Sequence, residues 1–236
     1  MIQTFLLIGQ SNMAGRGPMD EVPPIDNPAV RMFRDGVWLP AAEPLHADKP
    51  AMTGIGPGMS YADALQRRHG GTIGLVPCAF GGTSLREWQP GESLFTEAIQ
   101  ATRAALLAGG VLKGVLWHQG ESDSDTWEDA ERYDTGFWSM YHPLTEQIGG
   151  RGVPFLIGEL GEFLADYTPG CGFFRTTNRK LEEIAKGGPA FAWVPATGLT
   201  DRGDSLHFDA PSQRVFGLRY ADAWEQAAVR LGMRLT

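Results

Sequence analysis

The feature that most constrains the fold is a repeated alternation of short apolar runs with longer segments of helical periodicity. Apolar runs of strand length occur at residues 3–9, 71–79, 112–120, 153–160 and 190–196. Helical patterns occur at residues 58–68, 93–110, 131–147, 176–186 and 211–231. Runs that are apolar throughout are typical of strands buried on both faces, and the helices between them connect parallel strands. The pattern predicts an α/β fold with a central parallel five-stranded sheet that helices cover on both faces.

Length and charge limit the class of protein. The 236 residues contain no internal repeat and no linker-like stretch, which predicts a single domain over residues 1–236. The formal net charge of −8 argues against a nucleic acid or an anionic membrane as a partner. No apolar run is long enough to span a bilayer. The lack of a leader pattern favours a cytoplasmic protein, or a secreted or periplasmic one if a leader has been removed.

Two cysteines, Cys78 and Cys171, are too few for a disulfide scaffold. Cys78 ends an apolar run, which favours a buried thiol over a nucleophile. Cys171 lies in a loop-like stretch and has no assignable role. The sequence leaves open whether the two cysteines form a disulfide.

Polar clusters follow the predicted strands at their carboxyl ends. Because parallel strands end at one edge of a sheet, these clusters share that edge, where open α/β sheets bind their ligands. The clusters are Gln10-Ser11-Asn12, Gly81-Gly82-Thr83-Ser84, Gln119-Gly120-Glu121, Glu159, and the loop with Asp204 and His207. This edge is therefore the candidate site.

Ser11 is the candidate nucleophile, and His207 is its candidate base. The chain has no G-x-S-x-G elbow and no phosphate-binding glycine loop. Among the five histidines, His207 alone combines a carboxylate three residues earlier, Asp204, with a place on the candidate edge. That spacing lets the carboxylate accept the imidazole Nδ1–H, so that Nε2 can take the serine proton.

Three loops offer hydrogen-bond donors for an oxyanion, the negatively charged oxygen that forms when a serine attacks an ester. The backbone N–H of Ser11 is one donor, and the Gly81-Gly82 pair lets a backbone N–H approach a substrate closely. The side chain of Gln119 can add an NH₂ group. We expect Ser11, Gly82 and Gln119 to form the oxyanion hole, with Gly82 favoured slightly over Gly81.

Four sequence blocks resemble a known family. The blocks "IGQSNMAGRG", "GGTSLREW", "WHQGESD" and "DSLHFD", in this order, span residues 8–209. They are similar to the sialate O-acetylesterase and carbohydrate esterase family 6 branch of the SGNH hydrolases, which includes acetylxylan esterases. The resemblance implies a three-layer α/β/α sandwich, hydrolysis of acetyl esters on a carbohydrate, and no metal or other cofactor. Better-known SGNH branches have an asparagine where this chain has Gln119.

The resemblance also carries residue roles over to this chain. It implies Ser11 as nucleophile, His207 as base, Asp204 as the residue that orients it, and the same oxyanion hole. Other residues in or beside the matched blocks are expected to bind substrate or to support the site: Gln10, Asn12, Arg16, Gly81, Glu121 and Trp88. Trp88 and Trp127 either stack on a sugar ring or belong to the core.

Ser205 competes with Ser11 as nucleophile, because residues 203–206 spell "GDSL", the name of an esterase motif. In that esterase group the motif serine follows the first strand, and here Ser11 has that place. Ser205 is also only two residues from His207, a poor separation for the required hydrogen bond. Ser205 is therefore interpreted as a loop residue.

Three other classes of function stay open. A metal-dependent hydrolase would use ligands from His118, Glu121, Asp123, Asp204, His207 and Asp209. A glycan-binding module would keep the fold without catalysis, and a lipase or thioesterase would use the same scaffold. Loops 18–57 and 161–175 are expected to set the specificity. The partner expected is an acetylated carbohydrate, either a glycan or sialic acid, and the oligomeric state is undetermined.

Overall fold

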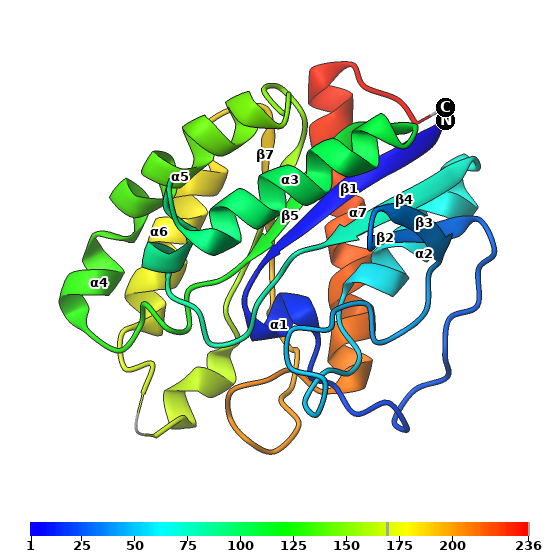
Figure 1. Cartoon of the computed structure of the whole chain (residues 1–236). Coiled ribbons are helices and arrows are strands. Elements are labelled where there is room, and N and C mark those ends of the chain that lie inside the picture. Colours follow the sequence, from blue (N-terminus) through cyan, green and yellow to red (C-terminus); the bar gives the residue numbers. More distant parts are fainter. Residues whose placement is uncertain (169, 236) are drawn as a thin grey trace.

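The computed structural model describes residues 1–168 and 170–235, and within them seven strands form one sheet (Figure 1). The strand order is β3-β2-β4-β1-β5-β6-β7, and every neighbouring pair is parallel except β2 and β3, which are antiparallel. The strands are β1 (Ile2–Gly9), β2 (Val30–Arg34), β3 (Val37–Pro40), β4 (Thr72–Pro77), β5 (Gly110–His118), β6 (Phe155–Gly158) and β7 (Phe191–Val194). The α/β class and the parallel core of the sheet are confirmed.

The sheet has two strands more than predicted, because β2 and β3 form a hairpin at its edge. Arg34 pairs with Val37 across a two-residue turn, and both turn residues have positive φ, 52° at Asp35 and 82° at Gly36. Asp-Gly between apolar runs is a strong hairpin signal. The two strands are short, and β3 is mostly exposed, so neither resembles the fully apolar runs of the buried strands.

Helices cover both faces of the sheet and bury two apolar clusters (Figure 1). Successive residues of β1 alternate between them: Phe5 and Leu7 pack with α2 and α7, whereas Leu6 and Ile8 pack with α3, α5 and α6. Burial on both faces explains why β1 is apolar throughout. The helices are α1 (Ser11–Ala14), α2 (Gly58–His69), α3 (Ser93–Leu107), α4 (Trp127–Glu131), α5 (Tyr133–Gln147), α6 (Phe174–Ala185) and α7 (Ala210–Leu231).

The position of β1 creates the site. β1 lies between β4 and β5. The strands β2 to β4 therefore lie on one side of β1, and β5 to β7 lie on the other. The loops that follow β1, β4 and β5 converge at the carboxyl ends of these strands. This is the crevice in which open α/β sheets bind ligands. Short 3₁₀ turns at Leu85–Trp88 and Glu162–Asp166 shape two of the surrounding loops.

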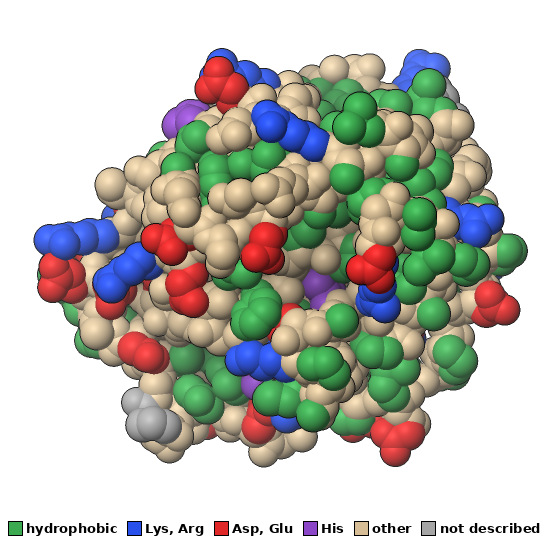
Figure 2. All heavy atoms as spheres, in the orientation of Figure 1, with side chains coloured by type: hydrophobic (Ala, Val, Ile, Leu, Met, Phe, Trp, Pro, Cys, Tyr) green, Lys and Arg blue, Asp and Glu red, His purple; other side chains and the backbone are tan. Residues whose placement is uncertain are grey.

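Several smaller features bear on the sequence-based expectations. Cys78 and Cys171 are both free thiols. None of the helices in the described residues has the length and apolarity needed to cross a membrane. On the face drawn in Figure 2, Lys and Arg side chains are interspersed with Asp and Glu rather than gathered into one basic field.

Candidate active site

Ser11 lies where β1 ends and α1 begins. The chain can turn there because Gly9 has a φ of +128° and lies against the neighbouring strand β5. A Cβ at Gly9 would lie 2.0 Å from the carbonyl oxygen of His118, so a larger residue would separate the two strands. Ser11 is only 5% exposed and lines a cavity at this edge of the sheet.

His207 joins Ser11 to Asp204. Its Nε2 lies 3.1 Å from the Ser11 Oγ, and its Nδ1 lies 2.8 Å from the Asp204 Oδ2. Burial would raise the pKa of Asp204, but hydrogen bonds from His207 and Arg202 hold that pKa well below its usual range. Asp204 is therefore an anion that accepts Nδ1–H, which leaves the His207 Nε2 as an acceptor for the serine proton.

The loop that carries His207 is fixed to the end of β1. The Asn12 Oδ1 accepts a hydrogen bond from the Phe208 N–H (3.1 Å), and the Asn12 Nδ2 donates to the Leu206 carbonyl (3.1 Å). Asn12 thus holds the backbone on both sides of His207. Asn12 belongs to the support of the site, one of the two roles predicted for it.

Ser205 lies in a turn of the same loop and does not line the cavity around Ser11. Its φ is +55°, and its N–H donates to Asp201 Oδ2 at 2.7 Å, a carboxylate that also accepts from the Gly203 N–H. In the structure, Ser205 therefore forms part of the turn. This agrees with its interpretation as a loop residue.

The two glycines of the Gly81-Gly82 pair differ in whether their N–H is available. The Gly81 N–H donates to Asp48 Oδ2 at 2.8 Å. The Gly82 N–H has no acceptor among the described residues, and neither has the Ser11 N–H at the start of α1. Gly82 has a φ of +74°, a conformation that favours glycine. Of the pair, Gly82 is the residue with a proton free for a substrate oxygen.

Gln119 lies behind the cavity rather than in its wall. The side chain is completely buried, and its Nε2 donates to Gln10 Oε1, to the Thr83 carbonyl and to Asp123 Oδ2. Its Oε1 accepts from the Tyr133 hydroxyl at 2.7 Å. An NH₂ group with acceptors inside the protein has no proton left for an oxyanion. The structure thus corrects the prediction that Gln119 belongs to the oxyanion hole.

Burial also decides the roles of the two tryptophans. Trp88 is 0% exposed, and its Nε1 donates to Thr83 Oγ1, so Trp88 belongs to the core and cannot stack on a sugar in this structure. Trp127 is 60% exposed but does not line the cavity. The aromatic residue that does line it is Tyr167, in the predicted specificity loop 161–175, of which residue 169 lies outside the described residues. Sequence analysis missed Tyr167.

Two buried charged residues complete the wall near Ser11. Arg16 pairs with Asp48 at 2.6 Å, and both side chains are almost completely buried. Glu121 accepts from Asn12 Nδ2 at 2.6 Å, and its Oε1 lies 3.4 Å from the His118 Nε2. Burial would raise the pKa of Glu121, but His118 and Asn12 lower that pKa below its usual value. Both Glu121 and Arg16 line the cavity, and their roles in substrate binding or support stay predictions.

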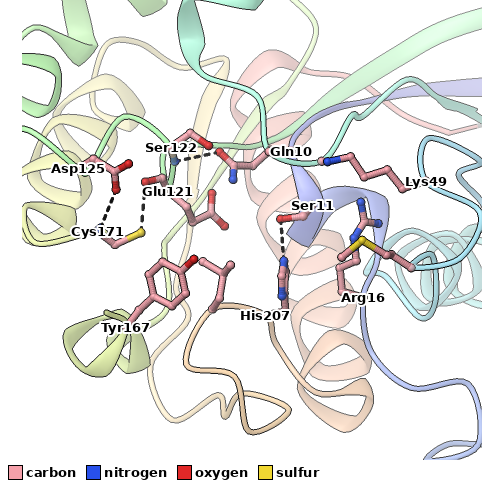
Figure 3. Close-up of a pocket in the computed structure, with 14 residues that line it drawn as sticks. Gln10, Ser11, Arg16, Lys49, Glu121, Ser122, Asp125, Tyr167, Cys171 and His207 are labelled. Carbon is pink, nitrogen blue, oxygen red and sulfur yellow. Dashed lines mark hydrogen bonds between the residues drawn. The ribbon is translucent and has the colours of Figure 1, made fainter. Parts of the chain in front are cut away.

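The cavity has a volume of about 270 Å³ and opens beside the Ser11 Oγ (Figure 3). Its further lining includes Gln10, Lys49, Met52, Gly81, Gly82, Ser122, Asp125, Tyr167, Cys171, Leu206 and His207. Figure 3 shows Glu121 and Tyr167 on one side of Ser11, and Lys49 and Arg16 on the other. Residues 1–168 and 170–235 contain no cluster of three or more His, Cys, Asp or Glu residues arranged to hold a metal ion.

Comparison with known proteins identifies the family. A family model described as "Carbohydrate esterase, sialic acid-specific acetylesterase" matches residues 1–226. A probable carbohydrate esterase of Arabidopsis thaliana is 33% identical in an alignment 247 positions long, and the match covers 94% of this chain and 90% of the relative.

Solved structures support the same assignment. The X-ray structure of the protein from that Arabidopsis thaliana locus has a TM-score of 0.84 and 30% identity, and the match covers 94% of this chain and 97% of the other. A carbohydrate acetylesterase from Xanthomonas citri, 21% identical, has a TM-score of 0.69 over 96% of this chain and 57% of the other, which shows the shared fold. The chain belongs to the carbohydrate esterase family of sialic acid-specific acetylesterases.

Proposed function

We propose that this carbohydrate O-acetylesterase removes acetyl groups through an acetyl-enzyme intermediate on Ser11. The observation that carries the proposal is the chain of contacts from Ser11 Oγ to His207 Nε2 (3.1 Å) and from His207 Nδ1 to Asp204 Oδ2 (2.8 Å). These are the contacts that a serine needs in order to lose its proton during attack. All three side chains lie at the cavity or directly behind its wall.

The reaction has two halves. In the first, Ser11 Oγ attacks the acetyl carbonyl carbon while its proton moves to His207 Nε2. The tetrahedral oxyanion accepts hydrogen bonds from the N–H groups of Ser11 and Gly82, and His207 then protonates the departing sugar oxygen. In the second half, His207 takes a proton from water, hydroxide attacks the acetyl-Ser11 carbonyl, and the proton returns to Ser11 as acetate leaves.

The size of the cavity suits the substrate class. A cavity of about 270 Å³ accommodates an acetyl group together with part of a sugar ring, and leaves the rest of a glycan outside. Its lining includes polar and charged side chains that can form hydrogen bonds with sugar hydroxyl groups, among them Gln10, Glu121 and Asp125. The family description names sialic acid, and the Arabidopsis relative is named a probable carbohydrate esterase, so both acidic and neutral acetylated sugars are candidate substrates.

Acetate release from a small set of esters tests this function. The set is O-acetylated sialic acid, acetylated xylo-oligosaccharide, p-nitrophenyl acetate and p-nitrophenyl palmitate, each assayed with and without a chelator. We expect acetate from at least one acetylated sugar, little hydrolysis of the palmitate, and no effect of the chelator. Binding of the sugars without acetate release would favour a glycan-binding module. Preference for the palmitate would favour a lipase, and loss of activity on chelation a metal-dependent hydrolase.

A further inference from the structure

The oxyanion site described above has only two free donors, because the Gln119 amide is occupied. Its Nε2 is committed to Gln10, Thr83 and Asp123. Serine hydrolases derive much of their rate from donors and charges directed at the oxyanion. A further positive group, Lys49, lies in the cavity wall next to Gly82.

Lys49 extends along the cavity wall, and its ammonium group lies next to Gly82. A Cβ built on Gly82 would lie 3.3 Å from the Lys49 Nζ, so the ammonium group is an immediate neighbour of Gly82. Figure 3 shows the Lys49 side chain extended, with its nitrogen directed to the side of the cavity where Gln10 and Ser11 lie. The ring of Phe80 lies beneath the ammonium group, with its centroid 5.9 Å from Nζ.

The backbone around Lys49 is fixed. The preceding residue, Asp48, accepts hydrogen bonds from Arg16 Nη2 (2.6 Å) and from the Gly81 N–H (2.8 Å). These contacts tie the Lys49 segment to the glycine pair. The Lys49 carbonyl in turn accepts from the Met52 N–H at 2.8 Å. Lys49 therefore starts from a rigid base, although its sequence context, "HADKP", is that of an ordinary loop.

The charge of Lys49 has no counter-ion within the described residues. No carboxylate oxygen there lies within ion-pair distance of its Nζ, whereas Arg16, the other cation of the cavity, is paired with Asp48. In a chain with a net charge of −8, an unpaired lysine that lines the cavity beside Gly82 needs an explanation.

We propose that Lys49 is a catalytic residue whose ammonium group stabilises the oxyanion beside the N–H groups of Ser11 and Gly82. The proposal rests on the proposed function. A positive charge at this place interacts more strongly with the oxyanion than with the neutral carbonyl of the bound ester, so it lowers the barrier to attack rather than tightening substrate binding. The Lys49 charge then takes the role that sequence analysis assigned to the Gln119 amide.

The test compares Lys49→Met, which keeps the length of the side chain and removes its charge, with wild type on p-nitrophenyl acetate and on one neutral acetylated sugar. Lys186→Met is the matched control, because Lys186 pairs with Glu182 on the exposed side of α6. We expect Lys49→Met to lose about 100-fold in kcat on both substrates with KM and melting temperature nearly unchanged. The control variant should match wild type.

A different role for Lys49 predicts a different pattern. If Lys49 binds a carboxylate of the substrate, Lys49→Met will raise KM for O-acetylated sialic acid and leave p-nitrophenyl acetate unaffected. That result would overturn the proposal, as would an unchanged kcat on all substrates. If wild type itself releases no acetate from any ester, the proposed function fails. A wild type that is active and a Lys49→Met variant that equals it would refute only the role of Lys49.

Restoring the charge separates catalysis from structure. Lys49→Cys treated with 2-bromoethylamine gains a side chain that ends in an ammonium group at nearly the length of lysine. Cys78 and Cys171 should react slowly, because burial raises the pKa of both thiols to about 12; treated wild type controls for this. We expect the treatment to restore at least a tenth of wild-type kcat. A fully modified, folded variant that stays as slow as Lys49→Met would contradict the proposal.

Discussion

Two polar clusters lie near Ser11 at the carboxyl end of the sheet: the loop cluster, Asp204 and His207, and the strand cluster, Gln10, Gln119 and Asp123. They differ in whether a hydrogen-bonding atom stays free to contact a substrate. In the loop cluster, His207 Nε2 lies 3.1 Å from the Ser11 Oγ, directed at the reacting atom. In the strand cluster, the Gln119 amide has all its partners inside the protein. Both residues follow strands at the same edge, so a place at that edge does not by itself make a residue catalytic.

The hydrogen-bond partners of the two side chains explain the difference. Gln119 is completely enclosed, and a buried amide must satisfy its donors with nearby protein groups, here Gln10, Thr83 and Asp123. His207 is held by its own loop through Asp204, which occupies only Nδ1 and leaves Nε2 facing the cavity. Substitutions in the loop cluster are therefore expected to reduce catalysis, whereas substitutions in the strand cluster are expected to reduce stability.

Among variants of the two clusters, the largest effect is expected from Asp204→Asn. An asparagine keeps the size of the side chain but no longer selects the His207 tautomer with a free Nε2, so kcat should fall by about 10³- to 10⁴-fold on p-nitrophenyl acetate. Asp222→Asn is the matched control, because Asp222 pairs with Arg68 on an exposed surface and does not line the cavity. The loop cluster would lose its assigned role if both variants kept at least a tenth of wild-type activity.

Gln119→Leu is expected to affect stability more than catalysis. The substitution removes the Gln119 side-chain hydrogen bonds to Asp123, Thr83 and Tyr133. Asp123 keeps the Leu85 N–H and the Tyr133 hydroxyl keeps the backbone carbonyl of residue 119, so the free energy of unfolding should fall by only about 2–3 kcal/mol. The folded variant should keep kcat within about tenfold. Urea denaturation and kinetics at a temperature where the variant is folded measure both. A loss of kcat of about 100-fold with unchanged stability would return Gln119 to the oxyanion hole.

The strand cluster should also make stability depend on pH through Asp123. Burial raises the pKa of Asp123 to about 6 from its ordinary 3.8, despite hydrogen bonds from Gln119 and from the Leu85 N–H. The folded protein then keeps a proton that the unfolded chain releases, so the free energy of unfolding decreases as pH rises from about 4 to about 6. The total decrease is about 2–3 kcal/mol.

Asp123→Asn isolates this contribution, since asparagine does not titrate. The stability of wild type relative to the variant should fall between pH 4 and pH 6 and stay constant above about pH 6.5, as measured by urea denaturation at each pH. If the free energy of unfolding had the same pH dependence in both proteins, Asp123 would have its ordinary pKa, and the prediction would be wrong.

The smallest effect is expected from Ser205→Ala. Ser205 forms the turn through its backbone N–H, which alanine retains, and its side chain does not line the cavity. The kcat/KM for p-nitrophenyl acetate should therefore stay within about twofold of wild type. A loss of several orders of magnitude would identify Ser205 as the nucleophile and invalidate the comparison between the two clusters.

The sequence sufficed for the parallel core of the sheet, because burial on both faces makes these strands apolar throughout. It was also enough to find the residues of the loop cluster, since Asp204 and His207 are close in sequence. The hairpin of β2 and β3 was missed although Asp35-Gly36 signals it, because its strands are short and β3 is exposed.

Other features depend on tertiary contacts that no local pattern contains. The choice of Gly82 over Gly81 depends on Asp48, which is distant in sequence and accepts the N–H of Gly81 but not that of Gly82. The burial of Trp88 depends on its edge-on packing against Trp117 of β5. The position of Lys49 depends on the same Asp48 contacts, so its loop sequence gave no signal.

The most direct test of the central claim is the rate of Ser11→Ala on p-nitrophenyl acetate, measured beside wild type and Ser205→Ala. If Ser11 is the nucleophile, its loss should reduce kcat by about 10⁴-fold or more while the protein stays folded, and Ser205→Ala should remain active. A Ser11→Ala variant that keeps the wild-type rate would contradict the acetyl-Ser11 mechanism and the role assigned to His207.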